Sequence, residues 1–334
     1  MINPQRTGPD LVRATRTFSR ESRAHSWWAV GSTLAIIVVL LALTAIAPWW
    51  PVQLVGSVFC ALMFVRMFVI YHDYLHGAIL KGSPTARVIM HVFGTLALTP
   101  PRVWKHSHNF HHRHNMQIET SSVGSFPVYT VEMWRQSSFW SRVGYRLTRH
   151  PLAILLGYVT VFVYEMCIGS FLADPRKNWD AGLALLLHGV IITLLWIFAG
   201  PTVLLFTVFL PYTLAATFGV YLFYSQHNFE GVYIQPTEEW THARASLKSS
   251  SFMKFGPIMN WFTANIGYHH IHHLNPMIPF YRLPEAMKHT PELQNPIVTT
   301  LRPSSVLKCL RLKLWDPDNR RMVSFKAAAE ASGV

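Results

Sequence analysis

Charged residues are scarce in this chain. Asp, Glu, Lys and Arg make up 13% of the 334 residues, and 51% of the residues are hydrophobic. A soluble domain carries about 25% charged residues, so this composition excludes an ordinary water-exposed surface. Although the length also suits two soluble domains, we predict one all-α integral membrane domain over residues 1–334.

Cysteine and acidic residues are also few. Three cysteines, Cys60, Cys167 and Cys309, are too scattered for a disulfide framework or a thiolate metal site. The 16 Asp and Glu residues are outnumbered by 29 Lys and Arg residues. These basic residues are spread through the presumed loops, so we expect no nucleic-acid partner. Membrane topology explains them, because Lys and Arg accumulate on the cytoplasmic side.

Long uncharged runs at residues 27–65 and 181–229 predict four transmembrane helices in two hairpins, at residues 27–71 and 181–225. The first run is interrupted only by Ala-Pro-Trp-Trp-Pro at 47–51, and the second by Ala-Gly-Pro at 199–201. Each arm is close to the roughly 20 residues needed to cross a bilayer. We expect Pro211 to kink the returning helix. The first run is too long for a signal-peptide core, so we expect it to be retained.

Both predicted external turns lack Lys and Arg, which orients the hairpins. Residues 1–26, 72–180 and 226–334 are then cytoplasmic, and the last of these forms a helical cap. The apolar stretch from Leu152 to Ala173 contains Glu165, and a single crossing there would separate the histidine windows described below. We therefore expect that stretch to be interfacial or re-entrant. Residues 306–312 have the pattern of an amphipathic docking helix.

Histidine is the abundant residue with chemical meaning, at 18 copies. On a helix, residues three and four apart share a face, so the window at 72–76 supplies two imidazoles on one face. The windows at 108–112 and 269–273 supply three each, and His227 follows the last predicted span. The histidines that spacing predicts to bind metal are His72, His76, His108, His111, His112, His269, His272 and His273. Spacing alone leaves His227 equally interpretable as a ninth ligand or as an interfacial histidine.

The ligand types restrict the metal. Imidazole suits zinc, copper, iron and nickel. A closed structural zinc site needs about four ligands, so this many histidines imply two ions, and two redox-active irons fit best. We expect Asp73, Asn265 and His270 to support the ligands by accepting their remaining ring N–H. His106 points to nearly the opposite helix face and is left out, and the isolated histidines are interpreted as bystanders.

At these residues the chain resembles the membrane fatty acid desaturases, specifically the bacterial acyl-lipid branch. The three windows match, in order, that family's histidine boxes H-x3-4-H, H-x2-3-H-H and H/Q-x2-3-H-H. Three longer segments agree as well: Trp104-Lys-His-Ser-His-Asn-Phe-His-His112, Tyr224-Ser-Gln-His-Asn-Phe-Glu230 and Asn265-Ile-Gly-Tyr-His-His-Ile-His-His-Leu-Asn-Pro276. The resemblance covers nearly the whole chain.

The resemblance implies that the nine histidines bind a di-iron centre that uses O2 to introduce a cis double bond into a lipid-linked acyl chain. It also implies a bacterial inner membrane location with the site on the cytoplasmic side. The family's cytochrome b5 signature His-Pro-Gly-Gly is absent from this sequence, so electrons are expected from a separate ferredoxin- or flavodoxin-type carrier. The acyl-CoA branch has an asparagine where Phe223 stands, so that additional ligand is not expected.

Two alternatives remain at this point. The same boxes occur in alkyl-chain and carotenoid hydroxylases, and spacing does not separate the two outcomes. A histidine-lined metal-binding or transport protein is a different class, although transport sites usually lie near the bilayer midplane. Aromatic residues, among them Trp104, Trp261 and Tyr268, are candidates for the wall of an acyl tunnel. Oligomeric state is not predicted.

Overall fold

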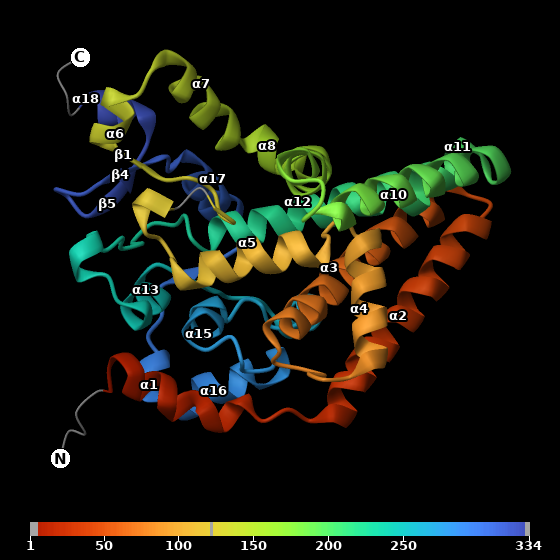
Figure 1. The fold of residues 1–334 in the computed structure, drawn as a ribbon, viewed down its shortest axis with the longest axis horizontal. Coiled ribbons are helices and arrows are strands. Elements are labelled where there is room, and N and C mark those ends of the chain that lie inside the picture. Colours follow the sequence, from red (N-terminus) through yellow and green to blue (C-terminus); the bar gives the residue numbers. More distant parts are fainter. Residues whose placement is uncertain (1–5, 121–122, 331–334) are drawn as a thin grey trace.

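The computed structural model describes residues 6–120 and 123–330, and it is mostly helical (Figure 1). Four helical segments are long and apolar enough to cross a membrane: α2 (Arg23–Ile46), α3 (Trp50–His76), α10 (Trp179–Phe198) and the continuous run Gly200–Ser225. The last run consists of α11 (Gly200–Leu204), a π-helical turn (Leu205–Phe209) and α12 (Leu210–Ser225). The four segments are those expected from the uncharged runs.

Proline and glycine set the ends of these helices. α2 stops at Ile46, just before Pro48, and α3 begins at Trp50 with Pro51 in its first turn, where a missing N–H costs nothing. α3 ends at Gly77, whose φ of +79° suits glycine. The π-helical turn ends at Phe209, two residues before Pro211. Proline lacks a backbone N–H, so the regular hydrogen-bond ladder is interrupted at this point.

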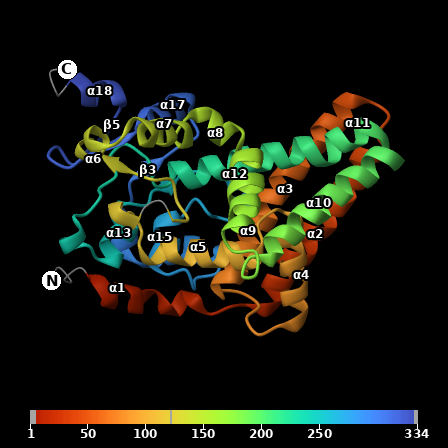
Figure 2. The same cartoon turned by 45° about the horizontal axis from the view of Figure 1, so that its top comes forward.

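A second layer of shorter helices leads to and from the four spans (Figure 2). α4 (Pro84–Leu96) and α5 (Pro101–Arg113) follow α3, and α6 (Val131–Gln136) and α7 (Phe139–Thr148) follow α5. The stretch at 152–173 becomes α8 (Pro151–Leu155), a π-helix (Tyr158–Gly169) and α9 (Ser170–Ala173). This stretch is not among the four candidate spans found in the described residues.

The remaining chain forms a polar cap, which we define as residues 6–22 and 226–330. It contains α1 (Gly8–Thr15), α13 (His242–Lys248), α14 (Pro257–Phe262), α15 (His269–Leu274), α16 (Leu283–His289), α17 (Pro303–Arg311) and α18 (Phe325–Glu330). The amphipathic pattern at 306–312 lies mostly within α17, which packs Val306, Cys309 and Leu310 against the buried end of α12.

The expectation of an all-α protein is wrong in one respect. The strands β1 (Tyr129–Thr130), β4 (Leu314–Asp316) and β5 (Arg321–Val323) form a three-stranded sheet, and β2 (Phe252–Met253) pairs in parallel with β3 (Val298–Thr299). These pieces are too short to show an alternating pattern. They form because folding brings distant loops side by side and their backbone groups need partners.

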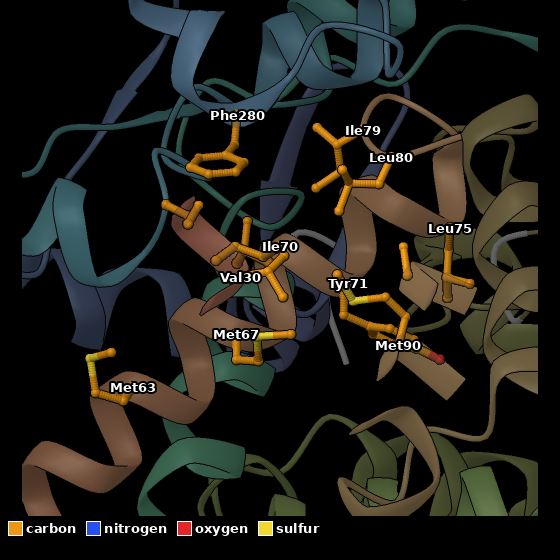
Figure 3. Packing of buried hydrophobic residues seen from close by; sticks show 14 of the residues in the cluster. Val30, Met63, Met67, Ile70, Tyr71, Leu75, Ile79, Leu80, Met90 and Phe280 are labelled. Atoms are coloured by element: carbon orange, nitrogen blue, oxygen red, sulfur yellow. The ribbon is translucent and has the colours of Figure 1, made fainter. Parts of the chain in front are cut away.

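The main core surrounds the second half of α3. Met67, Ile70 and Tyr71 are fully buried, and Figure 3 shows them in one cluster with Val30 of α2 and Phe280 of the cap. α4 approaches closely at Gly94, because a Cβ there would come within 2.5 Å of the Tyr71 hydroxyl oxygen. α3 therefore connects the four spans to the cap and holds its last turn in a fixed position.

Candidate metal centre

Four elements bring the predicted histidines together. His72 and His76 lie in the last turns of α3, and His108, His111 and His112 lie on one face of α5. His227 follows the end of α12, and α15 carries His269, His272 and His273. The first window therefore belongs to the spanning helix itself, whereas the cap and α5 supply the others.

The first group consists of His72, His76, His108, His112 and His272, whose ligand nitrogens lie within 4.8 Å of one another. The Nε2 atom of His108 is 2.9 Å from that of His72 and 3.0 Å from that of His112. The Nε2 atom of His272 is 3.1 Å from that of His112. The Nε2 atom of His76 is buried and has no hydrogen-bond partner.

The second group contains His111, His227 and His273, again within 4.8 Å. His269 joins it, because its Nε2 atom is 3.0 Å from that of His227 and 3.1 Å from that of His273. The Nε2 atoms of His111 and His227 are 3.1 Å apart. All nine predicted histidines thus fall into two adjacent groups of five and four.

Hydrogen bonding between the rings does not explain these contacts. The Nε2 atom of His108 faces two other Nε2 atoms, and a neutral ring nitrogen offers only one proton or one lone pair. Two nitrogens bound at right angles to one metal at about 2.0–2.1 Å would lie about 2.9 Å apart. The observed separations of 2.9–3.1 Å match that geometry, so the residues present fit two metal ions.

Burial keeps these rings in the form that binds metal. It lowers the pKa of His227 to about 4, and it lowers the pKa of His108, His111 and His112 well below 6.5, with further lowering by neighbouring histidines. The same causes lower the pKa of the three α15 histidines in the two groups. A neutral imidazole keeps a free lone pair, so both groups are ready for a cation.

Asp73 orients one of the ligands. Its Oδ1 atom lies 3.1 Å from Nδ1 of His72, and its Oδ2 atom accepts the backbone N–H of Phe280 at 2.7 Å. A ring that donates Nδ1–H to this carboxylate presents the lone pair of Nε2 to the metal. The Nδ1 atom of His227 is held in the same way by the carbonyl oxygen of Ser249 at 3.0 Å.

The other two expected supporting residues have different partners. The Asn265 amide donates to the carbonyl oxygen of Phe280 at 3.1 Å, so it reaches His72 only through Phe280 and Asp73. The Nε2 atom of His270 lies 3.2 Å from the carbonyl oxygen of Leu293, and the residue is absent from both groups. The backbone partners at Ser249 and Phe280 were missed, since any residue type can supply them.

The remaining histidines of these windows lie outside the two groups. His106 is exposed on the outer face of α5, as its helical position predicts. His114 stacks on Phe110 with ring centroids 4.0 Å apart, and its Nδ1 atom contacts the carbonyl oxygen of Phe110 at 3.0 Å. The spacing rule therefore separated His106 from the grouped histidines of α5.

An apolar cavity of about 1460 Å³ ends at the histidines. His72, His108 and His269 line one end, and residues of the spans such as Leu41 and Val203 line the other. Trp104 forms part of the wall and stacks on His108 with ring centroids 4.1 Å apart. Phe223 also faces the cavity and lies 5.2 Å, centroid to centroid, from His111.

Two of the three aromatic residues suggested for a tunnel wall do not line this cavity. Trp261 covers Arg66, whose guanidinium carbon is 4.2 Å from the ring centroid. Tyr268 packs against Phe252 with ring centroids 4.8 Å apart. Both residues lie in the cap, and the sequence pattern does not predict the conformation of the cap loops.

Comparison with known proteins agrees with this arrangement. The fatty acid desaturase family model matches residues 48–300. The chain is 32% identical over 272 residues to a fatty acid desaturase of Bacillus subtilis (strain 168), covering 81% of this chain and 77% of that protein.

Two plant relatives are more distant. An endoplasmic reticulum omega-3 fatty acid desaturase of Vigna radiata var. radiata is 25% identical over 281 residues, covering 76% of this chain and 68% of that protein. A chloroplastic sn-2 acyl-lipid omega-3 desaturase (ferredoxin) of Helianthus annuus is 24% identical over 281 residues, covering 78% of this chain and 61% of that protein. The chain therefore belongs to the fatty acid desaturase family and is an oxidoreductase that desaturates acyl chains.

Proposed function

We propose that this protein introduces a cis double bond into a lipid-linked acyl chain, using O2 and two iron ions held by the nine histidines. The observation that carries the proposal is the apolar cavity that runs from the spanning helices to both histidine groups. An acyl chain in that cavity places its methylene groups beside the metal-binding nitrogens. Residues of α2, α3 and α12 line the cavity, which favours a substrate that resides in the bilayer.

The number of grouped histidines favours two ions with open positions over one closed structural zinc site, which takes about four ligands. When bound, an iron pair supplies the oxidising power to remove hydrogen from an unactivated methylene. In the overall reaction, –CH2–CH2–, O2, two electrons and two protons become –CH=CH– and two waters.

The residues of the chain hold and shield the reactants. Trp104 and Phe223 exclude water from the histidine end of the cavity, because Trp104 packs against His108 and Phe223 packs against His111. Asp73 keeps the metal-binding lone pair of His72 on Nε2. Span residues in the cavity lining support a cavity at the depth of the acyl chains of the bilayer.

Electrons are proposed to come from a separate carrier of the ferredoxin or flavodoxin type. The name of the Helianthus annuus relative includes ferredoxin, which supports this assignment. The distribution of Lys and Arg supports a two-hairpin topology in a bacterial plasma membrane, with the single domain presenting its histidines on the cytoplasmic side.

Expression in a desaturase-deficient bacterium tests the reaction. Gas chromatography with mass spectrometry of derivatised lipids should show new unsaturated acyl chains and should locate the double bond. His111→Gln is the control, because it removes one ligand of the second group and should abolish the product. Hydroxylated lipid without new double bonds would assign the protein to the hydroxylases, and tightly bound metal without O2 consumption would indicate a metal-binding or transport protein.

A further inference from the structure

The outer face of α5 carries a row of basic residues behind the histidines. Arg102, Lys105, His106 and Arg113 are exposed there, whereas His108, His111 and His112 are buried. The spacing of i, i+4 and i+11 puts Arg102, His106 and Arg113 along one side of the helix, and Lys105 lies at the edge of that side, next to the histidine-bearing face. We call these four residues the α5 basic face.

The charges of this face are not neutralised by the chain itself. Within the described residues, none of Arg102, Lys105 and Arg113 forms an ion pair with a carboxylate. The carboxylate of Asp180 is buried and accepts only the backbone N–H of Arg102, at 2.9 Å. Uncompensated cations on one exposed face create a positive potential that attracts an acidic partner.

The α5 basic face lies close to the grouped histidines, which suits a docking site for a redox partner. A helix with its side chains is about 10–12 Å across, so a molecule bound to the α5 basic face lies one helix diameter from three cluster histidines. The half-buried Phe110, stacked on His114, adds an apolar contact beside the cations. A small mixed surface of this kind suits the brief encounters of redox proteins.

The direction of α5 favours a protein over a lipid surface. In Figures 1 and 2, α5 starts beside α4 and runs away from the four spans toward α13. From Arg102 to Arg113 the helix extends about 16 Å, since each residue rises about 1.5 Å. The headgroup layer of one leaflet is only about 5–8 Å thick, so lipid phosphates reach one end of the face and leave Arg113 beyond them.

We propose that the α5 basic face is the docking surface for an acidic one-electron carrier protein, which passes electrons through α5 to the metal centre. This inference rests on the proposed function, because it names where the proposed carrier binds. The same helix then serves both purposes, with its inner face holding ligands and its outer face receiving the donor.

The test is a double charge reversal, Lys105→Glu/Arg113→Glu, in the iron-loaded full-length protein in phosphatidylcholine vesicles. With a reduced plant-type [2Fe–2S] ferredoxin as donor, the KM for ferredoxin should rise about tenfold or more and its salt dependence should weaken. Product formation in a single turnover, in which the protein is reduced with dithionite without oxygen, freed of dithionite and then mixed with O2, should match the wild type, because a small reductant needs no docking surface. The neutral variant Lys105→Gln/Arg113→Gln should give an intermediate KM.

The matched control is Arg302→Glu/Arg311→Glu, which changes net charge equally at two exposed positions flanking and ending α17. Its KM for ferredoxin should stay close to that of the wild type. An equal rise in KM in both reversals, or no rise at Lys105 and Arg113, would overturn the docking surface. An effect that occurs only when phosphatidylglycerol is added to the vesicles would assign the face to lipid and overturn it as well.

The two proposals fail in distinguishable ways. If neither ferredoxin nor dithionite drives product formation by the wild-type protein, the proposed desaturation itself fails. If dithionite drives it and the α5 variants behave like the wild type with ferredoxin, only the docking surface fails. Unchanged iron content in each variant confirms that the site is intact.

Discussion

The histidines of this protein differ in which ring nitrogen, Nδ1 or Nε2, contacts a hydrogen-bond partner. His72 has Asp73 at its Nδ1 atom, and His227 has the carbonyl oxygen of Ser249. His270 sits between two grouped histidines in sequence, yet its Nε2 atom faces the carbonyl oxygen of Leu293. A ring whose Nε2 atom has a backbone partner is not available as a ligand through that atom, which gives neighbouring residues opposite roles.

The Asp73→Asn substitution tests the orientation of His72. An amide has one acceptor and one donor end, so it cannot accept from both the His72 ring and the Phe280 backbone N–H. We expect iron affinity to fall by about 10–100-fold, as for other residues that orient metal ligands. Iron retained after dialysis against a chelator measures this change. Asp318→Asn, at an exposed turn, should retain iron fully, and equal retention in both variants would contradict the orienting role.

Two substitutions in α15 distinguish a proposed metal ligand from a neighbouring histidine that lies outside both groups. His272→Gln should lose iron from the first group, whereas His270→Gln should keep it and lower the free energy of unfolding by about 1–3 kcal/mol, the cost of a disturbed buried hydrogen bond. Metal analysis and thermal unfolding of the purified variants measure both effects. Iron loss in His270→Gln at unchanged stability would assign His270 to the metal centre.

Among the elements, α12 and the π-helix at 158–169 decide the shape of the cavity. Gly219 of α12 lines the cavity, and a Cβ at that position meets no atom within 4 Å. The neighbouring wall includes Tyr158 and Phe162 from the π-helix, where one extra residue per turn shifts side chains out of the usual helical register. Helical periodicity alone does not show which side chains face this space.

Gly219→Phe should fill the cavity without unfolding the protein. The ring occupies free space, and replacing a helical glycine removes an entropic cost of about 0.5–1 kcal/mol, so stability should be retained while acyl desaturation is lost. Gly189→Phe in α10 is the matched control, because its Cβ also meets open space and Gly189 does not line the cavity. Product formation in bacterial membranes measures both. Full activity of Gly219→Phe would show that substrate does not use this cavity.

At the scale of the whole molecule, the two histidine groups lie at one end of the four candidate spans. The two short turns before α3 and α11 lie at the opposite end from α5 and α15 (Figure 1). The three cysteines are buried, which leaves little background for labelling with thiol reagents.

Cysteine labelling tests the proposed orientation. A membrane-impermeant maleimide added to spheroplasts should label Trp49→Cys, at an exposed position in the first turn, because that turn is proposed to be external. It should label Lys326→Cys in α18 only after the membrane is permeabilised. The reverse pattern would place the metal centre outside the cell.

Acid should destabilise the metal-free protein. The pKa of buried His227 and His270 is about 4, against about 6.5 for an unfolded histidine, so the unfolded chain binds more protons at acidic pH. Stability is therefore complete above pH about 6.5 and falls between about 6.5 and 4, by on the order of 1 kcal/mol per pH unit for each such histidine. The thermal midpoint of the metal-free, detergent-solubilised protein should drop from pH 7.5 to pH 5. A midpoint independent of pH over this range would show that the rings are not buried as neutral groups.

The sequence by itself determined the four spans and the set of grouped histidines. Hydrocarbon selects uncharged runs of a fixed length, and helical periodicity decides which histidines share a face. Both are local properties, so composition and spacing are sufficient for the spans and for the eight histidines of the three windows, whereas His227 was assigned through the family resemblance. They separated His108 from His106 before any contact was known.

Only the tertiary structure decided how the four histidine-bearing elements meet. The division into groups of five and four depends on the angles between α3, α5, α12 and α15. The support of His72 comes from a backbone N–H some 207 residues away, and the strands form from loops that carry no pattern of their own. Long-range packing and backbone hydrogen bonds are insensitive to side-chain type, which is why they leave little trace in the sequence.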